Sequence, residues 1–238
     1  MSAPIALQLY SLRELLNVDY AAGIRKVAEI GYAGVETAGF PNTTPQAATR
    51  LFVELGLTVC SAHSPLPLGD KQAEVLDTMA ALGCARLVCP WKPQELFASL
   101  DGIRQVCDEL NEANAVARAH GLTLSYHNHW AECAQVGGRR AYEIMLDQLA
   151  PDILFEVDTY WAQTAGVDPA VMVRQLGSRA PDATQWLLVT KRPPTRDDLT
   201  LDADLEHHLF KTNSRGSRPF CAVDYSIPEK GVQATHSD

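Results

Sequence analysis

The sequence predicts an α/β fold of the (β/α)8 or TIM-barrel type, regular to about residue 181 and incomplete or atypical after it. Short apolar segments alternate with amphipathic helical segments six times, which favours a parallel sheet with a helix in every crossover. No glycine-rich GxGxxG turn follows the first predicted strand, so a closed barrel is favoured over a dinucleotide-binding open sheet. A chain of 238 residues fits one barrel domain.

Each predicted strand is a short apolar run that leads to a helix with recognisable start signals. Thr44 with Pro45, Ser99, and Asp168 with Pro169 are typical of helix N-caps and first turns. The six predicted strands lie in residues 4–12, 33–38, 57–63, 86–90, 122–129 and 153–158.

The pattern changes near the end of the chain. We therefore expect six barrel units in residues 1–181 and an atypical segment in residues 182–238. Residues 186–190, WLLVT, are a candidate seventh strand. The remaining tail has weak periodicity and many polar turn residues, so no eighth strand is predicted.

The composition favours a small-molecule partner. The net charge of −9 opposes nucleic-acid binding, which depends on Lys and Arg at phosphates. No apolar run approaches the roughly 20 residues that span a bilayer, and the N-terminus lacks a basic region typical of a signal peptide. The six cysteines form no CxxC pair and are expected to be small buried hydrophobic residues. We expect a cytoplasmic protein with a carbohydrate substrate and no membrane or nucleic-acid partner. A homo-oligomer is compatible with the sequence.

Polar residues at the ends of the predicted strands are the candidate site, because barrel active sites form at the carboxyl ends of the strands. Residues two apart on a strand share a face, so His127 and His129 point the same way, as do Glu156 and Asp158. Imidazoles and a carboxylate from neighbouring strands suit Mn²⁺, Zn²⁺ or another divalent ion, whereas Mg²⁺ prefers more oxygen ligands.

Structural roles compete with these assignments. A hydrogen-bonded structural role and a substrate contact are equally consistent with His63. For Trp91, packing at the barrel mouth and stacking on a sugar ring are equally consistent. Glu156 lies deeper in its strand, where an interior hydrogen-bonding carboxylate is the more common role. His207 and His208 lie in a charged stretch and are expected to face solvent.

Five motifs occur in order between residues 5 and 181: QLYSLRE, VAEIGYAGVETAG, LGLTVCSAH, SYHNHWAE, and FEVDTYW followed by AGVDP. Together they resemble the sugar phosphate isomerase/epimerase family, whose members have a xylose isomerase-like TIM barrel and are related to inosose dehydratase, ketose 3-epimerases and endonuclease IV. The resemblance implies a metal-dependent enzyme with one divalent ion, Mn²⁺, Zn²⁺ or Mg²⁺.

The resemblance also implies roles for individual residues of this chain. Those implied to hold the metal are His127, Asp158 and Glu132. Those implied to contact the substrate are Gln8, Tyr10, His63, Trp91 and Trp161. Those implied to act in catalysis are His129, Glu36 and Lys191.

The sequence departs from the family pattern after residue 181. Family members carry a strand reading approximately LLHVKDGP, whose His is a metal ligand. The nearest match here is LLVTKRPP, in which Val189 replaces that His and Arg192 replaces the Asp. No closing strand is found, so the Glu that serves the family there as metal ligand and acid–base group has no counterpart in this sequence.

Several functions follow from this pattern. The first is an isomerase or epimerase of a small sugar or polyol derivative, acting through an enediolate. The second is a dehydratase-type lyase on inososes or keto sugars, which would expel a hydroxyl group. The third is a catalytically degenerate, carbohydrate-binding barrel. A DNA-repair nuclease is disfavoured by the acidic balance.

Overall fold

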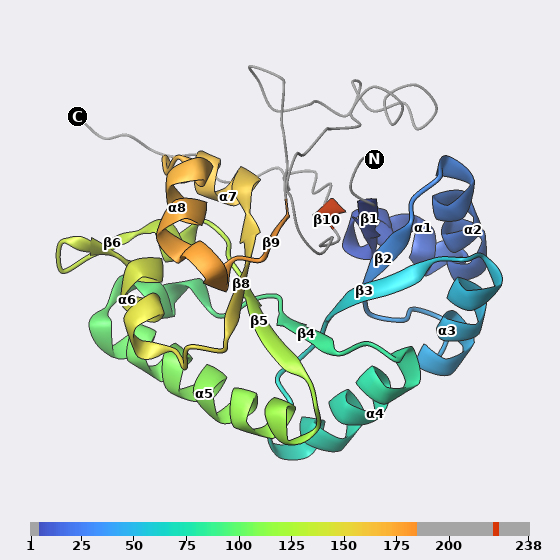
Figure 1. Cartoon of the computed structure of the whole chain (residues 1–238), viewed down its shortest axis with the longest axis horizontal. Coiled ribbons are helices and arrows are strands. Elements are labelled where there is room, and N and C mark those ends of the chain that lie inside the picture. The colour runs from blue at the N-terminus through green and yellow to red at the C-terminus, as the bar shows by residue number, and fades with distance from the viewer. Residues whose placement is uncertain (1–4, 185–220, 224–238) are drawn as a thin grey trace.

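A computed structural model describes residues 5–184 and 221–223 of the chain. Its main feature is an eight-stranded parallel sheet in the order β10, β1, β2, β3, β4, β5, β8, β9. The strands curve around an axis, and the helices cover the outside (Figure 1). The strands are β1 Ile5–Gln8, β2 Gly34–Ala38, β3 Thr58–His63, β4 Arg86–Cys89, β5 Thr123–His127, β8 Leu154–Asp158, β9 Asp182–Thr184 and β10 Cys221–Val223.

The helices follow the strands as the alternation predicts. They are α1 Arg13–Val18, α2 Tyr20–Ile30, α3 Pro45–Glu54, α4 Gln72–Leu82, α5 Leu100–Ala119, α6 Ala141–Gln148, α7 Thr159–Thr164 and α8 Pro169–Leu176. A hairpin of β6 Gln135–Val136 and β7 Arg139–Arg140 precedes α6. Among the described residues, no helix combines the length and apolar character needed to cross a membrane.

The predicted helix caps are confirmed. Thr44 accepts a hydrogen bond from the Ala47 N–H at 3.2 Å, Ser99 from Gly102 at 3.1 Å and Asp168 from Ala170 at 2.8 Å. Each cap satisfies a backbone N–H that has no partner within its helix.

The core fills the space between the sheet and the helices. Leu87, Leu124 and Val157 on the strands are fully buried, as are Ile103 and Leu110 on α5. Burial of both strands and helix faces fixes the strand ends, and with them the side chains that project beyond those ends.

The two edges of the sheet are formed by segments late in the chain. β9 pairs with β8, and β10 pairs with β1. Cα atoms of β9 and β10 come within 8 Å of each other, although within the described ranges no hydrogen-bonded ladder joins them. The fold is therefore a parallel α/β barrel that the described residues do not close at this seam. The candidate strand at residues 186–190 lies outside the described residues.

β10 is a strand that the sequence did not predict. It is three residues long, Cys221–Val223, and no periodic segment surrounds it in the sequence. Only its parallel pairing with Ile5, Ala6 and Leu7 of β1 defines it, and pairing between such distant segments leaves no local sequence pattern.

Candidate active site

The carboxyl ends of the strands bring the predicted polar residues together. Gln8 of β1 is in register with Glu36 of β2, and His127 of β5 is in register with Glu156 of β8. All four side chains are buried. Register places them at one level of the barrel, next to His63 at the end of β3.

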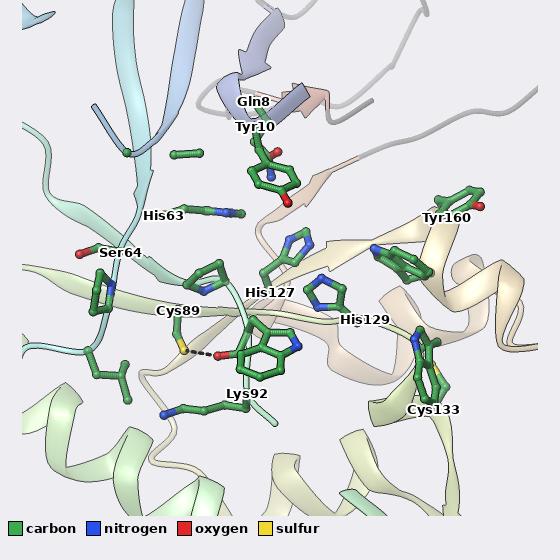
Figure 2. Close-up of a pocket in the computed structure, with 18 of the residues that line it drawn as sticks. Gln8, Tyr10, His63, Ser64, Cys89, Lys92, His127, His129, Cys133 and Tyr160 are labelled. Carbon is green, nitrogen blue, oxygen red and sulfur yellow. Dashed lines mark hydrogen bonds between the residues drawn. The ribbon is translucent and has the colours of Figure 1, made fainter. Parts of the chain in front are cut away.

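The Glu156 carboxylate is the centre of this cluster. Its Oε1 is hydrogen-bonded to Nδ1 of His127 at 2.8 Å and to Nε2 of His63 at 3.1 Å. The two imidazole rings meet edge to face with centroids 5.1 Å apart. Figure 2 shows both rings, together with His129, at the cavity. Glu156 was predicted to be an interior hydrogen-bonding carboxylate, and it has that position here.

Glu36 lies on the other side of His63. Its Oε1 is 3.1 Å from Nε2 of His63, and its Oε2 accepts a hydrogen bond from the Ser61 hydroxyl. Glu36 is fully buried and does not line the cavity. The structure therefore places it behind His63, in contact with that imidazole and not with the space where a substrate would bind.

Burial and ion pairing act in opposite directions on these groups. Burial raises the pKa of Glu156, but the hydrogen bonds from His127 and His63 outweigh it and hold the pKa well below its usual value. Burial likewise opposes protonation of His63, yet Glu36 and Glu156 raise its pKa well above the usual value. The pKa of His127 is raised against the effect of burial by Glu156. Burial and the charge of Glu156 raise the pKa of Glu36.

His129 has the opposite electrostatic setting. Burial, followed by the positive charges of His127 and His63, lowers its pKa to about 3. The ring lies 5.1 Å from the His127 ring and 5.5 Å from the Trp161 ring, centroid to centroid. Its Nδ1 has no hydrogen-bond partner among the residues that the structure describes. The His129 imidazole is therefore neutral at neutral pH, and it lines the cavity.

Asp158 and Glu132, two of the residues implied to hold the metal, differ in whether they reach His127. Asp158 caps α7 by accepting the Trp161 N–H at 2.9 Å, and its Oδ2 lies 3.6 Å from Nε2 of His127. Glu132 accepts hydrogen bonds from the Tyr126 hydroxyl and from the His129 backbone N–H. The structure thus brings Asp158 to His127 but directs both Glu132 oxygens to groups outside the cluster.

An open cavity of about 1720 Å³ lies over the cluster. All five residues implied to contact the substrate line it: Gln8, Tyr10, His63, Trp91 and Trp161. Gln8 is buried, and its Oε1 has no hydrogen-bond partner within the described part of the chain. Lys191, implied to be catalytic, lies outside the described residues.

One ion pair in the cavity wall was not predicted from the sequence. Nζ of Lys92 lies 2.8 Å from Oε1 of Glu109, and both residues line the cavity. Lys92 follows β4 and Glu109 lies on α5. Their positions in the sequence show no common pattern, although a Lys directly after Trp91 at a strand end was a signal that could have been followed.

One group of residues could hold a metal ion. Ligand atoms of His63, His127 and Glu156 all lie within 4.8 Å of one another. Two imidazole nitrogens and a carboxylate oxygen suit Zn²⁺ or Mn²⁺. Asp158, next to the other nitrogen of His127, has the position of the outer carboxylate that orients a metal-binding imidazole. The residues present therefore fit a divalent ion.

A parallel α/β barrel with its polar groups at the carboxyl ends of the strands is the class of protein that this fold and site define. Residues 24–186 match the xylose isomerase-like TIM barrel family. The chain belongs to this family. No curated protein matches the sequence significantly.

Solved structures give the same result for the fold. A sugar phosphate isomerase/epimerase from Parabacteroides distasonis ATCC 8503 is similar with a TM-score of 0.65 and 24% identity, over 76% of this chain and 73% of that one. A second from the same organism has a TM-score of 0.62 and 26% identity, over 73% and 75%. The probable 3-DHS dehydratase AsbF from Bacillus anthracis has a TM-score of 0.59 and 13% identity, over 76% and 72%.

The ion pairs around Glu156 predict a specific pH dependence of stability. The lowered pKa of Glu156 stabilises the fold above pH 4.5, and this contribution is lost as the pH falls through the folded-state pKa. The raised pKa of His63 stabilises the fold fully below pH 6.5, and this contribution is lost as the pH rises through its folded-state pKa. Glu156→Gln should therefore lower the free energy of unfolding by about 3–5 kcal/mol between those two pH values, and by less on either side.

Urea unfolding of the wild type and of Glu156→Gln from acid to alkaline pH would measure this difference in the free energy of unfolding. The exposed ion pair of Arg139 and Asp147, 2.7 Å long, supplies the control, because Asp147→Asn should cost at most about 1 kcal/mol. A constant difference between the wild type and Glu156→Gln across the whole pH range would contradict the assignment.

Proposed function

We propose that the protein is a metal-dependent isomerase or epimerase of a small sugar or polyol derivative, acting through an enediolate. The observation that carries this proposal is the juxtaposition of a neutral imidazole, His129, with the donor group of His63, His127 and Glu156. The three imidazoles line one cavity, and Glu156 lies behind His63 and His127. Family membership and the similar sugar phosphate isomerase/epimerase structures support the same reaction class.

His63, His127 and Glu156 would hold the divalent ion. When bound, such an ion polarises a substrate carbonyl and stabilises the oxyanion formed on proton removal. Asp158 would orient His127. In this arrangement Glu132 is not a ligand, because both of its oxygens accept other hydrogen bonds.

His129 would move the proton. Its pKa is lowered to about 3, so the ring is neutral at neutral pH and one of its two nitrogens is free to accept the proton next to the substrate carbonyl. An isomerisation or epimerisation is completed when a proton is returned to the enediolate carbon. Gln8 lines the cavity, and its side-chain amide would contact a substrate hydroxyl there. Glu36 would act behind His63 as a positioning residue, not as a catalytic one.

A dehydratase-type lyase is the second candidate, and one observation favours it. His63 lines the cavity with a raised pKa, so in this alternative its protonated imidazole would protonate a departing hydroxyl group and would not be a metal ligand. The same His129 would remove the first proton. The fold similarity to AsbF is compatible with this reaction.

The metal part of the proposal predicts one divalent ion per chain. Protein reconstituted with Mn²⁺ or Zn²⁺ and then desalted should retain near-stoichiometric metal by elemental analysis. His127→Ala and Glu156→Gln should lose most of it, because each removes a donor. The exposed His120, whose side chain is hydrogen-bonded to the Val116 carbonyl at 2.9 Å, gives the matched control His120→Ala, which should retain the metal. Equal metal in all four proteins would contradict the site.

The reaction is tested by product analysis in D₂O with ketoses, 3-keto sugars and inososes. An isomerase or epimerase should return a product that keeps the substrate's atoms and gains solvent deuterium at the carbon next to the carbonyl. A lyase should return a product lighter by one water. His129→Ala should lower turnover by about 10²–10⁴-fold, whereas His120→Ala should not. Metal binding without exchange or product from any of these compounds would support the degenerate, carbohydrate-binding barrel instead.

A further inference from the structure

Residues 126–129, at the end of β5 and directly after it, alternate in their direction. His127 and His129 line the cavity, whereas Tyr126 and Asn128 do not. Tyr126 and Asn128 are nevertheless almost completely buried. Polar groups buried away from a cavity need hydrogen-bond partners. The partners of these two side chains belong to residues implied to hold the metal, Glu132 and Asp158.

The Asn128 side chain joins the end of β5 to the end of β8. Its Oδ1 accepts the Asp158 N–H at 2.9 Å, and its Nδ2 donates to the Asp158 carbonyl at 3.2 Å. The last backbone register pair between these strands is His127 with Glu156. The amide of Asn128 thus continues the ladder one step further, at the point where the backbone of β5 turns away.

The Glu132 side chain holds the same segment from the other end. Glu132 lies in η4, a 3-10 helix of Ala131–Cys133, and is buried. It accepts the Tyr126 hydroxyl and, at 2.9 Å, the His129 backbone N–H. The Tyr126 ring is itself fixed against Phe97, with centroids 6.4 Å apart. Glu132 therefore closes a loop from the start of the segment to its end.

We propose that Asn128 and Glu132 are positioning residues: Asn128 sets the distance between His127 and Asp158, and Glu132 sets the direction of His129. The roles of these imidazoles in metal binding and proton transfer rest on the proposed function, but the hydrogen bonds of Asn128 and Glu132 do not. Glu132, a residue implied to hold the metal, acts here through the backbone of His129 and not on the ion.

The positions of the imidazoles can be measured in metal-free protein. In ¹⁵N-histidine-labelled protein, Asn128→Ala should shift the imidazole resonances of His127, and Glu132→Gln those of His129. Asn114 on α5 provides the matched control: it is also buried and donates to Asp152 at 3.1 Å, so Asn114→Ala removes a buried amide at a helix away from the β5 segment. It should leave these resonances at their wild-type positions.

The same variants are tested for Zn²⁺ affinity by competition with a chromophoric chelator. Asn128→Ala and Glu132→Gln should bind about 10–100-fold more weakly, and Asn114→Ala as the wild type does. Asn128→Asp keeps the acceptor for the Asp158 N–H but places an oxygen against the Asp158 carbonyl. Its Zn²⁺ affinity should fall between those of Asn128→Ala and the wild type. This variant also provides the test if Asn128→Ala does not fold.

Wild-type imidazole spectra and wild-type Zn²⁺ affinity in Asn128→Ala and Glu132→Gln would overturn the inference. Shifts of equal size in Asn114→Ala would overturn it too, because they would show a general response to lost buried hydrogen bonds. A wild-type protein that binds no Zn²⁺ would count against the proposed function alone, since the imidazole spectra of the metal-free variants still decide the positioning role.

Discussion

One carboxylate shared by two buried imidazoles is the interaction on which the site depends. Glu156 accepts from His127 and His63 through a single oxygen. A buried charge is costly unless it is paired and hydrogen-bonded, so the three side chains stabilise one another only while β3, β5 and β8 hold their ends at one level. The barrel supplies that constraint through parallel pairing and a packed core.

The site combines groups with opposite electrostatic settings. Carboxylates raise the pKa of His63 and of His127, whereas burial and the charges of these two imidazoles lower the pKa of His129. A bound cation would displace protons from His63 and His127, while His129, two residues after His127, would stay a neutral base at the cavity. Separate environments for neighbouring titratable groups are the usual basis of acid–base assignments in active sites, and they support the reaction class proposed here.

Local sequence patterns predicted the six regular βα units, because apolar periodicity and capping residues such as Thr44 and Ser99 act over a few residues. The two-residue period of strands also predicted that His127 and His129 share a face. The position of Glu132 could not be predicted in this way: it depends on η4 turning the chain back toward Tyr126. The pair of Lys92 and Glu109, and the strand β10, depend on contacts between distant segments.

We propose that His63, His127 and Glu156 surround one cation site. Anomalous diffraction from crystals of the wild-type protein soaked in Zn²⁺ would locate the cation. We expect a single strong anomalous peak in contact with these three side chains, with Asp158 next to His127. A peak at other residues, or three side chains that keep their mutual hydrogen bonds with no ion between them at saturating Zn²⁺, would contradict it.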